Sequence, residues 1–195
     1  NRAVARIAHA TAEDVERAVT AAREAFDSGP WGRMTARERG TYLIRIADLI
    51  EKHADELAFL EAVDAGKPVG SVHYSDLPIS LDSLRFFAGR ARLTRGVAAE
   101  MPDAAVIHHE FIEPMGVVAE ILPWNGPLWT GVQRMAAILA AGNTAIIKPA
   151  QMASLTFMRL AQLLLEADLP AGALNVVAGS GAIVGDALVR DPRVD

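Results

Sequence analysis

Apolar residues in the first half of the chain recur at helical spacing, in stretches that glycine and proline separate. The first stretch covers about residues 11–30, the second 35–68 with a break near His53, and the third ends around Gly96. The second stretch begins at a capping box formed by Thr35 and Glu38. This pattern predicts that residues 1–103 form a layer of helices.

Beyond residue 103 the periodicity changes from helical to extended. Val106 to Ile112 has the pattern of an exposed strand with mixed faces, and Pro114 ends it. We therefore expect a bridging strand over residues 104–115. Residues 116–195 then alternate as strand, helix, strand, helix, strand. These five elements are Gly116–Leu122, Leu128–Ala141, Thr144–Ile147, Ser154–Ala167 and Leu174–Val177.

The separations between these strands suit right-handed crossovers in a parallel sheet, whose ligands bind beyond the carboxyl ends of the strands. The predicted fold class is α/β: N-terminal helices, a bridging strand, and half of a doubly wound, Rossmann-like sheet. Gly142 is expected to end the first crossover helix in a left-handed cap, and Ser154 to cap the second. A third helix is expected within residues 179–190. A fourth strand would be due where the sequence stops, so the βαβαβ unit is expected to be truncated.

Composition excludes several classes of function. The chain has 195 residues, 22% of them charged, with a net charge of −5 and its basic residues scattered, so nucleic acid is not an expected partner. Its apolar runs are too short to cross a membrane, and no signal core leads the chain, so a cytoplasmic location is expected. It contains no cysteine, which excludes a disulfide, a thiolate metal site and a cysteine nucleophile within these residues. The histidines are isolated or on opposite strand faces, so we predict surface positions and no metal.

The turn after the first parallel strand, Ile121-Leu122-Pro123-Trp124-Asn125-Gly126-Pro127, leads directly into a helix. Free backbone N–H groups at that helix start could hold an anion, and the Asn125 amide could stabilise an oxyanion. The alternative is that Asn125 and Gly126 only form a tight turn.

The ends of the second and third strands also carry candidates. Lys148 could donate to ribose oxygens or a 2′-phosphate, and Gln151 could bond a hydroxyl without repelling a phosphate. The alternative for Lys148 is a solvated lysine at a strand end. The third strand leads into a glycine-rich turn that contains Gly179, Gly181 and Gly185. Its spacing and position depart from the dinucleotide fingerprint, so a tight strand-to-helix turn explains it equally well.

Several separate motifs together resemble the aldehyde dehydrogenase superfamily in order and spacing. They are Pro30-Trp31, Asp64 with Gly66-Lys67-Pro68, Glu113 to Val118, Pro123-Trp124-Asn125, Leu139 to Thr144, Lys148-Pro149-Ala150, and Leu169 to Gly172 followed by Leu174 to Val177. The resemblance runs essentially from end to end. It corresponds to an internal portion of less than half of a full family chain.

This resemblance implies oxidation of an aldehyde to a carboxylic acid by hydride transfer to a nicotinamide cofactor, through a cysteine thiohemiacetal and a thioester. Asn125 falls on the family's oxyanion-hole asparagine. The implied cofactor contacts are Ile121, Leu122, Pro123, Trp124, Lys148, Ala150, Gln151, Gly179, Gly181 and Gly185. The implied partners are a small-molecule aldehyde and, because residues 106–112 resemble the family's bridging segment, further copies of the chain in a dimer or tetramer.

The sequence also departs from the family pattern. Gln151 replaces the carboxylate that contacts the ribose, so we predict that NADP is tolerated or preferred beside NAD. Gly126 stands where an aromatic residue is common, so Trp129, Thr130 and Gln133 should form the pocket wall, with Trp129 filling the space. Arg134 replaces a lysine, which keeps the charge but changes its geometry.

The family's general-base glutamate and cysteine nucleophile lie downstream of the matched portion, so these residues alone cannot perform the covalent step. An alternative function is therefore a non-catalytic nucleotide-binding or assembly module. An unrelated α/β binding protein would keep the fold without these roles.

Overall fold

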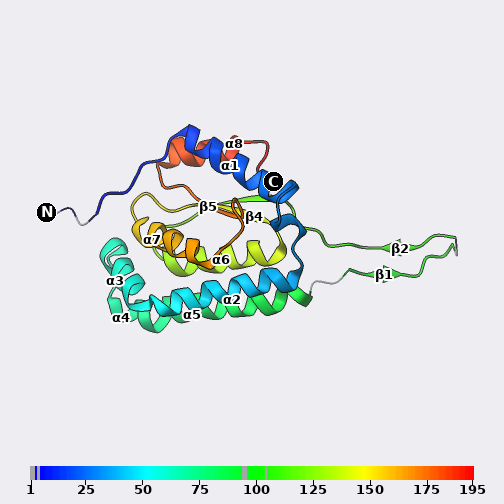
Figure 1. The fold of residues 1–195 in the computed structure, drawn as a ribbon, viewed down its shortest axis with the longest axis horizontal. Coiled ribbons are helices and arrows are strands. Elements are labelled where there is room, and N and C mark those ends of the chain that lie inside the picture. Colours follow the sequence, from blue (N-terminus) through cyan, green and yellow to red (C-terminus); the bar gives the residue numbers. More distant parts are fainter. Residues whose placement is uncertain (1–2, 4, 94–95, 104) are drawn as a thin grey trace.

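A three-stranded parallel sheet forms the centre of the computed structural model, which describes residues 3, 5–93, 96–103 and 105–195. The strands are β3 (Val117–Ile121), β4 (Thr144–Lys148) and β5 (Leu174–Val176), in the order β3-β4-β5. The register pairs Val117 with Thr144 and Ala145 with Leu174. Helices cover both faces of the sheet, so the predicted α/β class is confirmed (Figure 1).

The helices agree closely with the helical stretches of the sequence. Their bounds are α1 Ala12–Asp27, α2 Ala36–Lys52, α3 Ala54–Ala65, α4 Val69–Ser71, α5 Leu77–Arg90, α6 Pro127–Ala141, α7 Leu155–Leu164 and α8 Asp186–Arg190. Short 3-10 turns occupy Trp31–Arg33, Ala91–Leu93 and Leu165–Ala167, and π-helical turns occupy Val72–Asp76 (η2) and Gly181–Gly185 (η5). The helix expected within residues 179–190 is thus a π-helical turn followed by the short helix α8.

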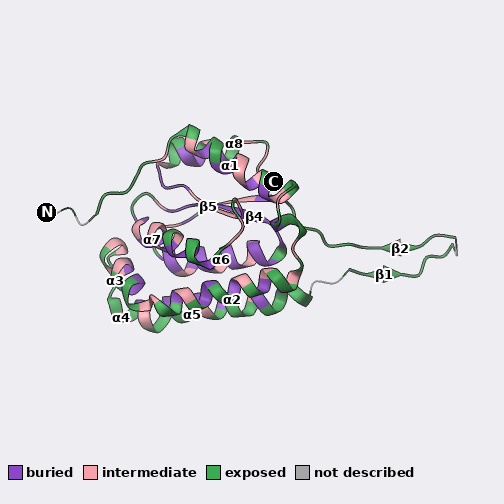
Figure 2. Ribbon diagram, in the orientation of Figure 1, coloured by how far each residue is buried: buried purple, intermediate pink, exposed green. Residues whose placement is uncertain are grey.

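Strand β4 is buried along its whole length (Figure 2). Its side chains alternate between two cores. Ala145 and Ile147 join a large cluster with residues of α2, α5, α6 and α7. Ile146 points the other way and packs with Val19 of α1 and Val184 of η5. This alternation follows from the two-residue period of a strand and explains the unbroken apolar sequence of β4.

The helices before residue 103 do not form a single layer, contrary to the sequence-based expectation. Helix α1 lies on one face of the sheet with α8, while α2 and α5 lie beyond α6 on the other face (Figure 1). Helical periodicity reveals that a helix has a buried face but not which surface covers that face. The sheet therefore separates α1 from the helices that follow it in sequence.

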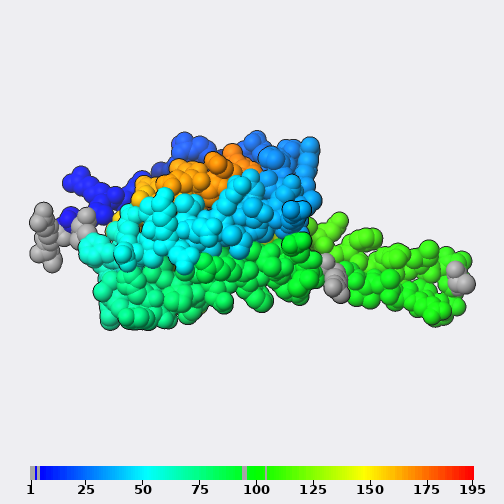
Figure 3. Space-filling view, turned by 60° about the horizontal axis from the view of Figure 1, so that its bottom comes forward, coloured from blue at the N-terminus to red at the C-terminus, as the bar shows by residue number. Residues whose placement is uncertain are grey.

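A two-stranded arm extends from the body of the molecule (Figures 1 and 3). It pairs β1 (Ala98–Ala99) antiparallel with β2 (His108–His109). The strand expected over Val106–Ile112 is therefore shorter than predicted, and its pairing partner comes from the segment assigned to the helical layer. Residue 104 lies outside the described part of the chain. The arm exposes 77% of Ile107 and 82% of Phe111, so it has no core of its own.

Local capping signals were predicted with mixed success. The Thr35 capping box is present, with the Thr35 N–H donating to Glu38 Oε2 at 2.8 Å. Gly142 ends α6 in the left-handed conformation at φ 97°. Ser154 stands at the N-cap position of α7, as predicted, but its side chain makes no cap hydrogen bond. Within the described ranges, no helix is both long and apolar enough to cross a bilayer.

Candidate active site

The carboxyl ends of the three parallel strands meet at one edge of the sheet, as the topology requires. Backbone hydrogen bonds continue just past the strands: Leu122 N–H donates to the Lys148 carbonyl at 2.9 Å, and Val177 N–H donates to the Ile147 carbonyl at 2.9 Å. The three turns that the sequence singled out therefore begin from adjacent, fixed positions.

Residues from all three strand ends converge at Gly185, which is buried in η5. A β-carbon built at this glycine would lie 3.8 Å from Ile121 Cδ1 and 3.9 Å from both Cδ and Cε of Lys148. Ile121 is 46% exposed, so this junction reaches the surface. The structure thus brings together three of the predicted cofactor contacts, which are 64 positions apart between Ile121 and Gly185.

Lys148 is buried, with only 3% of its surface exposed, which excludes the alternative of a solvated strand-end lysine. Its Nζ donates to the carbonyl of Pro149 at 3.0 Å, and no carboxylate pairs with it among the described residues. Burial disfavours the charged ammonium and lowers the pKa of Lys148. A buried amine with donors to spare at the end of a strand is suited to bind ligand oxygens.

The segment after Lys148 forms a tight turn. Ala153 N–H donates to the Ala150 carbonyl at 3.1 Å, and Gln151 lies exposed between them. Ala150 is half-buried, so Gln151 provides the accessible polar group of this turn.

In the turn after β3, Leu122 is buried and Pro123 half-buried, while Trp124 is 57% exposed. Asn125 is exposed, and its side-chain amide makes no hydrogen bond with the described residues. The amide donors of Asn125 are therefore available to a ligand.

At the start of α6, one of the backbone donors expected to be free for an anion already has a partner in the protein. Pro127 has no N–H, and the N–H of Leu128 donates to Glu61 Oε1 of α3 at 3.2 Å. Because this protein carboxylate already satisfies the free donor of Leu128, the donor is not available to an external anion.

Trp129 packs over Gly126 in the first turn of α6. A β-carbon at Gly126 would overlap the indole Nε1 of Trp129, so this tryptophan fills the space beside the glycine, as expected. Trp129 and Gln133 are half-buried and lie one turn apart, whereas Thr130 is buried. Trp129 and Gln133 are thus the better placed of the three to contact a substrate.

The glycine-rich turn after β5 is closely packed at one end and open at the other. Gly179 is buried, and a β-carbon there would lie 2.5 Å from Val184 Cγ2, whereas one at Gly181 would meet nothing within 4 Å. The hydroxyl of Ser180 accepts the Ile183 N–H at 3.2 Å and caps η5. Close packing against Val184 therefore requires a glycine at position 179, whereas the space beside Gly181 is open.

Sequence reasoning missed three carboxyl groups near these turns: the buried Glu61 and Glu120 and the half-buried Asp64. Glu120 is 5% exposed on β3, and burial raises its pKa to about 8, although the Arg134 guanidinium Nε lies 3.6 Å away and favours the charged form. The signal was available, because Glu120 interrupts an apolar strand, and Glu61 follows the core residue Leu57 at helical spacing.

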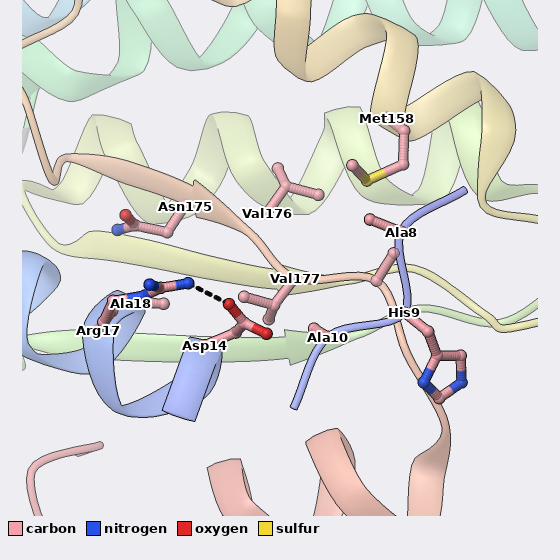
Figure 4. A pocket seen from close by; sticks show the side chains of 11 residues that line it. Ala8, His9, Ala10, Asp14, Arg17, Ala18, Met158, Asn175, Val176 and Val177 are labelled. Atoms are coloured by element: carbon pink, nitrogen blue, oxygen red, sulfur yellow. Dashed lines mark hydrogen bonds and ion pairs between the residues drawn. The ribbon is translucent and has the colours of Figure 1, made fainter. Parts of the chain in front are cut away.

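A cavity of about 390 Å³ beside β3 is lined by Ile121 together with Glu120 and Arg134, whereas the cavity beside β5 does not coincide with the predicted site. A cavity of about 380 Å³ lies beside β5, where Asp14 pairs with Arg17 (Figure 4). Its lining includes His9, Met158 and Asn175 and none of the predicted site residues. Over the described part of the chain, no cluster of three or more histidine or acidic side chains could hold a metal ion. His53, His73 and His108 are half-buried rather than fully on the surface.

Comparison with known proteins adds independent information. The family model described as "Aldehyde dehydrogenase family" matches residues 1–195. The chain is 43% identical, over 192 residues, to aldehyde dehydrogenase family 2 member B4, mitochondrial, of Arabidopsis thaliana, covering 98% of this chain and 36% of that relative. It is 40% identical, over 194 residues, to the cytosolic 10-formyltetrahydrofolate dehydrogenase of Mus musculus, covering 98% of this chain and 22% of that relative.

The solved structure of a Bacillus cereus aldehyde dehydrogenase in its NAD+ complex is also similar, with a TM-score of 0.93 and 40% identity. The match covers 96% of this chain and 38% of that one. The 195 residues thus span well under half the length of these relatives.

Proposed function

Because this chain belongs to the aldehyde dehydrogenase family, we propose that it supplies the cofactor-binding part of an NAD(P)-dependent enzyme that oxidises an aldehyde to a carboxylic acid. The convergence of Ile121, Lys148 and Gly185 is the observation that carries this proposal. At this junction Ile121 provides an apolar side chain, Gly185 leaves space beside the backbone, and the buried Lys148 amine has N–H donors that are not used within the described part of the protein. The NAD+ complex of the Bacillus cereus relative supports the same class of ligand.

The residues at this junction fit a nicotinamide dinucleotide. Lys148 would donate to ribose oxygens, Gln151 would reach a ribose hydroxyl, and Gly185 would allow close approach of the cofactor to the backbone of η5. When bound, the nicotinamide supplies the acceptor for a hydride. Leu122, Pro123 and Trp124, together with Ala150, Gly179 and Gly181, complete the proposed cofactor surface.

Asn125 would act on the substrate rather than on the cofactor. Its exposed amide can donate to the negative oxygen that develops on an aldehyde carbon after nucleophilic attack, the type of contact whose loss costs about 3–4 kcal/mol in known oxyanion holes. The covalent step requires a nucleophile outside these 195 residues, since they contain no cysteine. Gly126, Trp129, Thr130 and Gln133 are proposed to line the aldehyde pocket.

Nucleotide titration of the protein and of Lys148→Met tests the cofactor site. We expect the substitution to weaken binding at least tenfold, equivalent to about 1.4 kcal/mol or more, because a buried donor is lost. Lys52→Met is the matched control, since Lys52 is exposed at the end of α2. Unchanged affinity in Lys148→Met would contradict the proposed role of Lys148.

We further propose that the site accepts NADP as well as NAD or prefers NADP. Gln151 is neutral, so it does not repel a 2′-phosphate, and a carboxylate at this position would. We expect Gln151→Glu to weaken NADP binding about tenfold relative to NAD. A strong preference of the unmodified protein for NAD would show this part of the proposal to be wrong.

A non-catalytic nucleotide-binding or assembly module is the second candidate. It would bind nucleotide without oxidising any aldehyde, so an assay of nucleotide reduction with aldehyde present distinguishes the two functions. A cytoplasmic location stays a prediction, because the similar proteins include mitochondrial and cytosolic forms.

A homo-oligomer is proposed on the evidence of the arm. Its exposed apolar side chains Ile107 and Phe111 have no partner surface within the described part of this chain. We expect a dimer or tetramer by light scattering, and a smaller species when both residues are changed to serine. A monomeric unmodified protein would contradict this proposal.

A further inference from the structure

We propose that Glu61 and Asp64 of α3 are positioning residues that hold the two candidate loops at the ends of β3 and β4. Glu61 would fix loop 122–127, which carries Asn125, and Asp64 would fix loop 149–154, which carries Gln151. The inference rests on the proposed function of these loops.

One face of α3 presents both carboxylates to the core. Leu57, Glu61 and Asp64 follow one another four and three positions apart, which places them along one side of the helix. Leu57 and Glu61 are fully buried, and Asp64 is half-buried. Leu57 therefore anchors α3 in the core, and the two carboxylates beyond it face the helices that α3 contacts.

Each carboxylate accepts a hydrogen bond from the start of a different helix. Glu61 Oε1 accepts the N–H of Leu128, the second residue of α6, at 3.2 Å. Asp64 Oδ2 accepts the N–H of Leu155, the first residue of α7, at 2.6 Å. The first N–H groups of a helix have no partner within it and lie at its positive end, where a carboxylate is favourable.

Neither helix provides this cap from its own sequence. Gly126 precedes α6 and has no side chain, and Ser154 precedes α7 without making a side-chain hydrogen bond. The caps come instead from α3: Glu61 lies 67 positions before Leu128 in the sequence, and Asp64 lies 91 positions before Leu155. One helix thus sets where both α6 and α7 begin.

Both candidate loops are consequently fixed at each end. The sheet holds their first residues, since Leu122 N–H donates to the Lys148 carbonyl at 2.9 Å, and α3 holds the helices into which they lead. Asn125 lies only three positions before Leu128. A shift of the first turn of α6 would therefore move the Asn125 amide, and oxyanion stabilisation depends on the exact position of the donor.

Steady-state kinetics of the complete protein with Glu61→Ala and Asp64→Ala separate the two roles. We expect Glu61→Ala to lower kcat about 10- to 100-fold with little change in the Kd of NAD. We expect Asp64→Ala to raise the Kd of NAD about tenfold and to leave kcat at saturation within about threefold. Glu61→Gln and Asp64→Asn should recover most of each loss, because their amide oxygens still accept the N–H. Asp55→Ala is the control, since the Asp55 side chain on α3 is fully exposed.

Hydrogen exchange of the same variants keeps this inference separate from the proposed function. Glu61→Ala should speed exchange most in residues 122–130, with a smaller effect near Thr156, which Glu61 also contacts, and Asp64→Ala should act most in residues 149–157, whether or not the protein oxidises an aldehyde. Localised exchange in a protein without activity would support the positioning and contradict the proposed function. Equal effects of both substitutions on kcat, on Kd and on both segments would overturn the positioning roles.

Discussion

The indole of Trp129 lies directly over Gly126, so that a β-carbon on Gly126 would overlap the indole Nε1. The two residues share one volume at the start of α6, immediately after Asn125. The resemblance leads one to expect an aromatic side chain at position 126. Here the aromatic ring beside that position belongs to Trp129, three residues later. The shape of the proposed aldehyde pocket therefore depends on this pair rather than on either residue alone.

Gly126→Ala should destabilise the protein by about 1–3 kcal/mol, because the added methyl group overpacks against the indole. The cost should be largely absent in a Trp129→Ala background, where the obstructing ring is gone. Urea denaturation of the two single variants and the double variant measures this coupling. Equal costs of Gly126→Ala in both backgrounds would mean that the two residues do not compete for space.

Trp129→Ala should shift aldehyde preference toward bulkier substrates, because it removes the ring that fills the proposed pocket. The measurement is kcat/KM of the complete protein for a series of aldehydes of increasing size. Ile44→Ala, an exposed position on α2, serves as a control for nonspecific effects. An unchanged order of preference would place Trp129 outside the substrate pocket.

Glu120 should make the protein less stable as the pH rises. Burial raises its pKa from 4.5 to about 8, so between these values the folded protein holds a proton that the unfolded chain has released. Unfolding then releases a proton, and stability falls with rising pH by at most about 1.4 kcal/mol per pH unit. Urea denaturation between pH 5 and pH 8 measures the slope, which Glu120→Gln should reduce. An identical slope in Glu120→Gln would show that another group is responsible.

Gly185→Ala should leave folding stability unchanged or slightly higher while weakening nucleotide binding. Its β-carbon would make ordinary contacts of 3.8 Å and 3.9 Å with Ile121 and Lys148, but it would occupy the space where the cofactor is proposed to approach. Gly89→Ala on α5 is the matched control, because nothing lies within 4 Å of a β-carbon there and Gly89 is outside the proposed cofactor surface. Thermal denaturation and nucleotide titration of both variants provide the comparison; equal affinities would locate the cofactor elsewhere.

Trp31→Phe should cost about 1–3 kcal/mol of stability, because the fully buried indole Nε1 donates to the Asn143 carbonyl at 2.9 Å and that carbonyl would lose its partner. This hydrogen bond ties the segment after α1 to the start of β4. Trp124→Phe, at a position 57% exposed, should change stability by less than about 0.5 kcal/mol. Chemical denaturation tests both values, and similar costs at the two positions would contradict the argument.

Local chemistry determined much of this protein from its sequence alone. The capping box at Thr35, the left-handed glycine at Gly142 and the alternation of strands and helices after residue 116 depend on neighbours a few positions away. A pattern with a period of two or 3.6 residues records these short-range relationships directly. Parallel topology then requires Ile121 and Lys148 to lie at a common edge of the sheet, because both stand at the carboxyl ends of neighbouring strands.

Tertiary structure decided the relationships that span long stretches of chain. The sequence could not show that Glu61 caps a helix 67 positions away, that burial rather than solvent surrounds Lys148, or that the sheet lies between α1 and α2. Periodicity shows that a helix face or a strand is buried, but the identity of the covering surface depends on how all elements pack together. For the same reason, Ser154 had the right local chemistry for a cap, yet a carboxylate from α3 fills that role.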